Sequence, residues 1–260
     1  MISETKVKLK NTSKLCELID FYLYSEAFKK LSGAAQQDYE SCLVISRDAL
    51  GHVRLKNLTG TLAQDAYNIW LTRGIYRANK IASVLSIVLN KGVKMGLHIV
   101  NPMPHIDRET NPARKVTWTP EQVNMFLTTA YKRWRWRSIG LIMQMAYEWG
   151  QRVGDMRMLT WSVHLPISDP LMHVLKQQHE TFGFQCLVTP QMRPQDGAYK
   201  PYSKETLFSF VNQVKAAAGL PDELTAMDMR RSAITEMAEA GVSIATMKQV
   251  TGHTNINSLT

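Results

Sequence analysis

Apolar residues in the first hundred positions recur every three or four residues, the spacing that places them on one face of an α-helix. The pattern predicts four helices, which begin near Ser13, Gly33, Thr61 and Tyr76. The residues expected to face inward are Leu15, Leu18, Ile19, Tyr22 and Leu23; Tyr39, Leu43, Ser46 and Leu50; Leu62, Ala66 and Ile69; and Ala78, Ile81, Leu85 and Val88. Four helices in this length form a compact all-α domain, which we assign to residues 1–101.

Prolines interrupt the helical pattern in the next stretch. Pro102, Pro104 and Pro112 stand among polar residues, where neither a helix nor a strand should persist. We therefore expect residues 102–118 to link two domains. Thr119 followed by Pro120 has the sequence of a helix N-cap and first position, so a new domain is expected to begin there.

The second domain, residues 119–260, is predicted to be mostly helical with a small β-sheet. Short apolar segments at residues 163–167 and 185–189 are typical of strands, whereas the flanking segments have helical spacing. The fold class expected for the whole chain is therefore mainly α with a small sheet, built from an N-terminal four-helix domain and an α+β domain.

One segment of the second domain interleaves cations with tryptophans. It runs from Lys132 to Arg137 and reads KRWRWR. Aromatic and basic residues together are typical of nucleic-acid surfaces. Because the following helix is plainly apolar, we favour the interpretation that the tryptophans pack into the core while the cations stay in water.

Composition narrows the range of partners. Lysine and arginine outnumber aspartate and glutamate by 31 to 22, which gives a formal net charge of +9. Such an excess favours a polyanion, most commonly nucleic acid, although charge alone does not exclude an ordinary basic protein. No apolar run approaches the roughly 20 residues that span a bilayer, and the polar residues 1–14 do not have the pattern of a signal peptide. Three scattered cysteines, Cys16, Cys42 and Cys186, favour reduced thiols in the cytoplasm.

The candidate chemistry lies in residues 224–260. Two short helices are expected there, the first ending at Gly241 and the second at Gly252. Packing accounts for their apolar faces but leaves three cationic or imidazole side chains unexplained, namely Arg230, Arg231 and His253. An arginine early in one helix and a histidine just after the next can converge on one spot, and that spot would suit an anion.

A second arginine for such a site occurs upstream. Arg152 closely follows Gly150, directly after a long apolar helix. The planar guanidinium group matches two phosphate oxygens, and an imidazole adds a further donor. The simpler interpretation is that these residues are surface cations, which is the commonest situation for arginine.

The order and spacing of these residues resemble the two arginine boxes of the tyrosine recombinases, the phage-integrase family. The first arginine box, residues 150–161, has the pattern Gly-x-Arg-x-x-Asp followed by Leu-x-Trp. The second arginine box, residues 224–230, has the pattern Leu-Thr-x-x-Asp-x-Arg, and Ala240-Gly241-Val242 and Gly252-His253-Thr254 turns follow it. The resemblance of the fold extends over nearly the whole chain.

The resemblance implies a metal-free phosphoryl transfer on DNA that needs no cofactor. In this family a tyrosine hydroxyl attacks the backbone phosphate and forms a 3′-phosphotyrosyl link with a free 5′-hydroxyl. By the match, Arg152, Arg230 and His253 would bind the phosphate, and Asp155 would support Arg152. Fixed cations stabilise the charge that develops on the phosphate oxygens in the transition state.

The resemblance also implies partners and a cellular setting. Family members act as homotetramers on double-stranded DNA at attachment-type sites, in a bacterial cytoplasm, with accessory DNA-bending factors as further candidate partners. They integrate or excise phage genomes and other mobile elements. The first domain would correspond to the core-binding domain, and short polar and basic side chains on its fourth helix are the candidate DNA contacts. These are Arg73, Arg77, Asn79, Lys80, Ser83 and Ser86.

The sequence departs from the family pattern in three ways. Met227 occupies the position that is usually histidine, and a thioether cannot donate a hydrogen bond, so Arg231 is the candidate substitute. About 15 residues expected after Trp161, a hairpin with a catalytic lysine, have no counterpart. No tyrosine follows Tyr202. We expect this sequence by itself to be inactive in cleavage, either because a hairpin and a tail are missing from it or because of a true deletion.

These departures keep two other functions open. A DNA-binding or regulatory protein of recombinase fold without catalysis would explain Met227 and the missing lysine and tyrosine. A type IB topoisomerase shares the chemistry but relaxes supercoils instead of exchanging strands.

Overall fold

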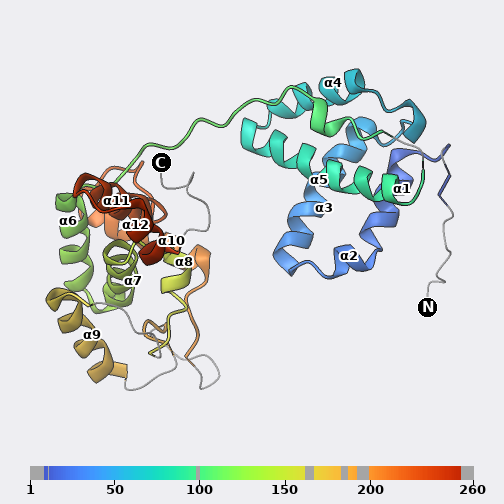
Figure 1. The fold of residues 1–260 in the computed structure, drawn as a ribbon. Coiled ribbons are helices and arrows are strands. Elements are labelled where there is room, and N and C mark those ends of the chain that lie inside the picture. Colours follow the sequence, from blue (N-terminus) through green and yellow to red (C-terminus); the bar gives the residue numbers. More distant parts are fainter. Residues whose placement is uncertain are drawn as a thin grey trace. The chain divides into compact units, whose positions relative to one another are not determined.

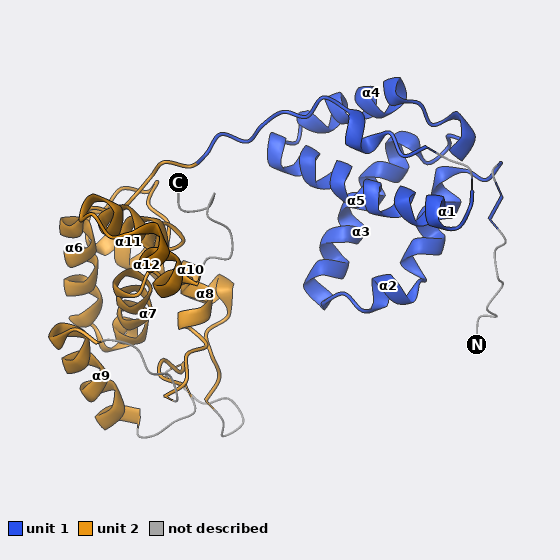
Figure 2. Cartoon of the chain, viewed as in Figure 1, with its two compact units in different colours: residues 1–113 blue, residues 114–260 orange. Residues whose placement is uncertain are grey.

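The computed structural model describes residues 9–10, 12–97, 100–161, 167–182, 187–191 and 199–252. The chain forms two compact units, residues 1–113 and residues 114–260, which Figure 2 shows in different colours. Among the described residues, no helix is both long enough and apolar enough to cross a membrane.

Unit 1 is a bundle of helices in which α5 makes the central contacts. The α-helices are α1 (Leu15–Leu23), α2 (Glu26–Lys29), α3 (Gly33–Leu50), α4 (Gly60–Leu71) and α5 (Ile75–Lys94), with 3₁₀ turns η1 (Leu55–Asn57) and η2 (Met103–His105). Helix α5 packs against α1, α3, α4 and η2 (Figure 1). Its predicted inward residues Ala78, Ile81, Leu85 and Val88 are fully buried, which confirms the helical pattern there.

The predicted inward face of α4 is right for Ala66, which is buried, and wrong for Leu62 and Ile69. Leu62 and Ile69 are 38% and 63% exposed, whereas the buried side of the helix carries Tyr67 and Trp70. Thr59 caps this helix, since its hydroxyl accepts a hydrogen bond from the Leu62 amide at 3.3 Å. The two large rings bury more apolar surface than two aliphatic side chains, so they decide the rotation of the helix.

The segment expected to begin the linker is part of unit 1. Met103 is fully buried in its core and Ile106 is nearly so. Asn101 donates hydrogen bonds to Ser86 and Asn90 of α5, and the Asp107 amide donates to Gln64 of α4. The proline-rich sequence prevents a long helix here but does not prevent packing, so the linker is shorter than residues 102–118.

Unit 2 is built around α7. Its helices are α6 (Pro120–Tyr131), η3 (Trp134–Trp136), α7 (Arg137–Glu148), α8 (Val153–Met156), α9 (Asp169–Phe182), α10 (Lys204–Ala217), α11 (Asp228–Glu239) and α12 (Ile244–Thr251). Every residue from Ser138 to Ala146 is buried, because α6, α8, α9, α10 and α11 all pack against α7 (Figure 1). The predicted helix start at Thr119 is confirmed, with its hydroxyl and the Gln122 side chain forming a capping box, while unit 2 already begins at residue 114.

The small β-sheet expected in unit 2 is not confirmed. The described residues of this unit contain two isolated antiparallel bridges, Thr160 with Leu187 and Pro190 with Pro201. Much of the two segments predicted as strands, residues 163–166 and 185–186, lies outside the described residues, as does Cys186. The mainly helical part of the prediction holds.

The tryptophans of the KRWRWR segment differ in their burial. Trp136 is buried as predicted, and the Arg133 guanidinium lies over its ring at 4.5 Å. Trp134 is 54% exposed and stacks on Phe182 at the end of α9, with ring centroids 5.8 Å apart. The packing interpretation is therefore right for Trp136 and wrong for Trp134.

The burial of Met103 generates the first prediction. Met103→Ala should destabilise unit 1 by about 2–4 kcal/mol, because it leaves a cavity in a packed core. Val100→Ala is the matched control in the same segment, since that side chain is 77% exposed. Hydrogen exchange of peptides from α1, α3 and α5 would measure the difference. Equal exchange in the two variants would show that residues 101–106 are a linker after all.

Candidate active site

The first arginine box begins where α7 ends. The Gly150 backbone has a φ of +57°, a conformation that costs little only for glycine. The chain turns there, and the Gln151 amide donates to the Ala146 carbonyl at 3.1 Å. Arg152 then occupies the N-cap position of α8 in an extended conformation, and its side chain is 65% exposed. The turn thus presents Arg152 to solvent from a rigid support.

Gly150 also packs the first arginine box against α11 and α12. A methyl group at its α-carbon would lie 2.8 Å from the Thr251 Cγ2 atom of α12, and the side chains of Ala233 and Met237 of α11 lie just beyond. The absence of a side chain therefore lets the end of α7 pack directly on α11 and α12. This contact explains structurally why the box begins with glycine.

Arg230 lies on the first turns of α11 and is only 9% exposed. Its Nη2 atom donates a hydrogen bond to the Thr251 carbonyl at 2.9 Å. Burial, and next the positive charge of Arg152, lower the pKa of the Arg230 guanidinium below its ordinary value, while Asp155 acts in the opposite direction. The structure therefore brings Arg152 and Arg230 into one electrostatic neighbourhood beside the end of α12.

Asp155 supports Arg152 only loosely. The shortest distance between the Arg152 guanidinium and the Asp155 carboxylate is 3.9 Å, within ion-pair range but too long for a hydrogen bond. Both side chains are mostly exposed, so the attraction is weak. The expected orienting role of Asp155 stays a prediction.

The other predicted site residues are found in different surroundings. His253 lies outside the described residues; helix α12 ends just before it, with Gly252 in the left-handed conformation expected from the sequence. Met227 precedes α11 and is 73% exposed. Arg231 donates to the Asp228 carboxylate at 2.8 Å and to the Val116 carbonyl at 3.2 Å. Arg231 is thus engaged in holding α11, and its role as substitute stays a prediction.

A buried carboxylate, Asp228, organises the start of α11, and sequence reasoning assigned it no role beyond the motif. It is 1% exposed and accepts hydrogen bonds from Arg114, Arg231 and Thr225. Burial by itself raises the pKa of Asp228, but the bonds from Arg114 and Thr225 together outweigh it and hold the pKa below the ordinary value. A signal was present, because an acidic residue in the first turn of a helix is a common stabilising feature.

The segment that leads into unit 2 is fastened at the same place. The Trp118 amide donates to the Ser232 hydroxyl at 2.7 Å, and its indole donates to the Thr225 carbonyl at 2.9 Å. Arg114 adds its bonds to Asp228. The second arginine box is therefore held from the N-terminal side of its own unit.

The candidate DNA-contacting residues of α5 are engaged within unit 1. Arg77 and Lys80 form ion pairs with Asp38 of α3, at 3.1 and 3.0 Å. Asn79 bonds to Tyr67 and to the Glu109 carbonyl, Ser83 accepts from Arg108, and Ser86 accepts from Asn101. Arg73 is exposed before the start of α5. These contacts organise the bundle, and a role in binding DNA stays a prediction.

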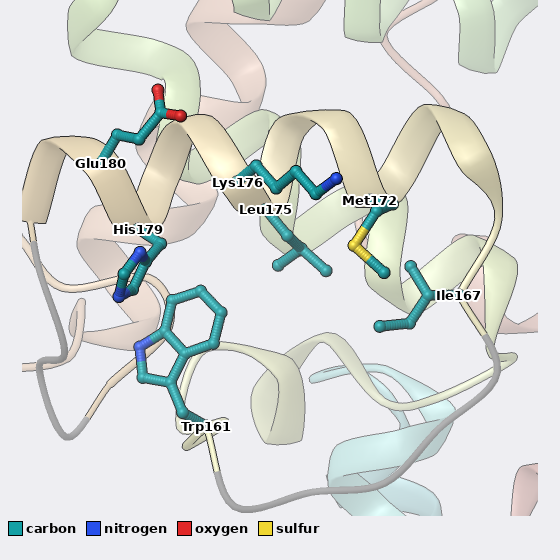
Figure 3. A pocket seen from close by; sticks show the side chains of 7 residues that line it. All are labelled: Trp161, Ile167, Met172, Leu175, Lys176, His179 and Glu180. Carbon is teal, nitrogen blue, oxygen red and sulfur yellow. The ribbon is translucent and has the colours of Figure 1, made fainter.

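An open apolar hollow of about 260 Å³ lies beside α9 (Figure 3). Its lining includes neither Arg152 nor Arg230. Trp161, the last residue of the first arginine box, packs edge-on against His179, with ring centroids 5.8 Å apart. The remaining lining residues are Ile167, Met172, Leu175, Lys176 and Glu180. This hollow therefore offers mainly apolar contacts.

Comparisons with known proteins bear on the fold of the chain and on the family of its second unit. Residues 163–260, which include the second arginine box, match the model of the Phage integrase family. A lambda integrase dimer bound to a COC′ core site matches with a TM-score of 0.76 and 18% identity, covering 96% of this chain and 77% of that chain. A lambda integrase tetramer bound to a Holliday junction matches with a TM-score of 0.78 and 19% identity, covering 96% and 78%.

A transposon protein gives a comparable result. The Tn1549 transposon integrase in complex with circular intermediate DNA matches with a TM-score of 0.76 and 15% identity, covering 95% of this chain and 94% of that chain. A search of curated proteins gave no match. At these identities the structural likeness defines the fold: the chain has the fold of the tyrosine recombinases. The match of residues 163–260 to the family model confirms the resemblance to the phage-integrase family.

Gly150 provides a test of the contact between the boxes. Gly150→Ala should destabilise unit 2 by about 1–2 kcal/mol from the left-handed backbone alone, and should displace Thr251. Gly154→Ala is the matched control, since no atom would lie within 4 Å of its methyl group. Thermal unfolding and hydrogen exchange of α12 would measure both effects. A Gly150→Ala protein as stable and as protected as the control would contradict the close contact.

Asp228 provides a test by pH. The pKa of Asp228 is lower in the folded protein than in the unfolded chain. As the pH falls, the unfolded chain therefore binds the proton first. The stability that Asp228 contributes is present above about pH 4 and is lost below it. Asp228→Asn should destabilise unit 2 at pH 7 by about 3 kcal/mol, because it leaves two arginines without their shared carboxylate. The difference from the wild type should shrink towards pH 3.

Asp222→Asn is the matched control for this experiment, because Asp222 is exposed six residues upstream. Urea unfolding between pH 7 and pH 3 would measure all three proteins. A difference between Asp228→Asn and the wild type that did not depend on pH would show that the carboxylate charge is unimportant.

Proposed function

We propose that this protein is a site-specific DNA recombinase of the integrase type, which cleaves and rejoins DNA through a 3′-phosphotyrosyl intermediate. The observation that carries the proposal is the convergence of Arg152 and Arg230 beside the end of α12. Two guanidinium groups held near each other at the end of α12 suit a ligand with two or more anionic oxygens. The confirmed fold makes a DNA phosphodiester the natural choice.

The proposed reaction needs charge stabilisation more than any other contribution. A tyrosine oxygen would form a bond to phosphorus, the bond to the 5′-oxygen would break, and that oxygen would take a proton. Negative charge on the non-bridging oxygens would be shared between Arg152 and Arg230, with His253 as a third donor. Arg230 is buried and bonded, so little reorganisation is needed when charge develops.

The proposal extends to assembly and setting. Since a lambda integrase tetramer has been seen on a Holliday junction, we propose that four copies of this protein act on two duplexes. Unit 1 would bind the core site through α5, and the target would be an attachment-type site of a phage or mobile element in a bacterial cytoplasm. DNA-bending proteins would assist, and neither metal nor other cofactor would take part.

A second candidate function is a DNA-binding protein of the same fold without catalysis. The exposed position of Met227 favours it, because a thioether there offers the phosphate no hydrogen bond.

Covalent trapping separates these candidates. The protein expressed from its complete reading frame would be incubated with a nicked suicide duplex that carries the DNA flanking its own gene. A recombinase should accumulate as a covalent complex through the 3′-phosphate, which phosphate-specific digestion and mass spectrometry would assign to a tyrosine. Tight binding without any covalent product would favour the second candidate.

The two arginines supply the quantitative prediction. Arg152→Ala and Arg230→Ala should each slow covalent trapping by about 100-fold or more, whereas DNA affinity should change only a few-fold, because many phosphate contacts share the binding. Arg133→Ala, which removes the same charge at the opposite end of α7, is the matched control. Trapping rates at saturating DNA and equilibrium binding would be measured separately. Losses of rate that merely follow losses of affinity would contradict the clamp.

A further inference from the structure

The C-terminal turn of α12 receives hydrogen bonds from two other parts of unit 2. The Gln151 Nε2 atom donates to the Val250 carbonyl at 2.6 Å. Arg230 donates to the next carbonyl, that of Thr251, at 2.9 Å. The last carbonyls of a helix have no partner within the helix, so these two side chains satisfy groups that would otherwise need water.

The same turn is also rigid in itself. The Gly252 amide donates to the Lys248 carbonyl at 2.9 Å, and the Thr251 hydroxyl donates to the Met247 carbonyl at 2.6 Å. Thr251 is buried against Gly150. A rigid turn that is bonded to one side chain beside Arg152 and to Arg230 itself can fix the spacing of the two arginines.

Gln151 is well placed to transmit this constraint. It precedes Arg152 directly, and its own amide is bonded to α7, so its backbone has little freedom. The guanidinium groups of Arg152 and Arg230 repel each other, and Arg152 can lower that repulsion by moving away into solvent. A neutral amide can hold the chain here without adding a charge that would compete with a phosphate.

We propose that Gln151 is a positioning residue: its side-chain amide ties the first arginine box to the end of α12, and thereby sets the position of Arg152 relative to Arg230. The proposal rests on the proposed function only for its catalytic consequence. A purely local role is the alternative, since the same nitrogen lies 3.3 Å from the Trp149 carbonyl within its own turn. The two roles differ in what happens at α12 when the amide is removed.

Gln151→Met keeps the length of the side chain and removes the hydrogen-bond donor. Gln151→Ala is a second variant, which removes the donor together with most of the side chain at this half-buried position. Gln213→Met, on the exposed side of α10, is the matched control. We expect both Gln151 variants to slow covalent trapping at saturating DNA by about tenfold or more, with DNA affinity within about twofold of wild type. Hydrogen exchange of residues 244–252 should become faster, and the melting temperature should stay close to that of the control.

The outcomes separate this inference from the proposed function. Unchanged exchange in α12 together with an unchanged trapping rate would overturn the positioning role while leaving the recombinase proposal intact. If the wild type is never trapped, the recombinase proposal fails, and exchange in α12 alone decides the inference: faster exchange in both variants supports the tie, and wild-type exchange refutes it. A slower trapping rate that accompanies a lower melting temperature would also overturn the positioning role, because such a loss would reflect general destabilisation of the protein.

Discussion

The packing where α7, α11 and α12 meet has to accommodate two like charges, those of Arg152 and Arg230. Arg152 lies close enough to Arg230 for its charge to lower the pKa of the Arg230 guanidinium. Three features hold the backbone of Arg152 and the side chain of Arg230 in place despite this repulsion: the left-handed turn at Gly150, the burial of Arg230 and the contact of both boxes with the end of α12. The free energy of folding compensates for this repulsion between the two guanidinium groups. Under the proposed function, a DNA phosphate that binds between the groups would lower the repulsion.

A buried carboxylate decides which arginine contributes to that pair of like charges. Arg114, Arg230 and Arg231 all lie at the start of α11, but the Asp228 carboxylate accepts bonds from Arg114 and Arg231. Arg230 points instead to the Thr251 carbonyl. Asp228 thus offsets one of the two positive charges of Arg114 and Arg231 and holds both side chains, and it stabilises the N-terminal end of the helix dipole.

The sequence predicted the features that depend on local spacing. The inward face of α5, the cap at Thr119 and the glycine that ends α12 follow from helical periodicity and backbone preference, and the structure has them. The rotation of α4 and the packing of Met103 depend on which side chains fill a shared core, which no local pattern contains. The same reason explains the site: spacing indicated Arg152 and Arg230, whereas the bonds of Gln151 and Asp228 join residues about 100 positions apart.

The polar face of α5 shows how such long-range bonds change a functional interpretation. Asn79, Ser83 and Ser86 hold the segment of residues 101–109, so any DNA that approached this face would meet that segment as well. Arg77 and Lys80 share one carboxylate, Asp38, which leaves one net positive charge among the three groups. A phosphate could therefore bind by replacing Asp38 for one of the cations, at little electrostatic cost because these pairs are partly exposed. The excess of cations over carboxylates is thus the feature of this helix that the proposed binding of DNA would depend on, more than its number of polar side chains.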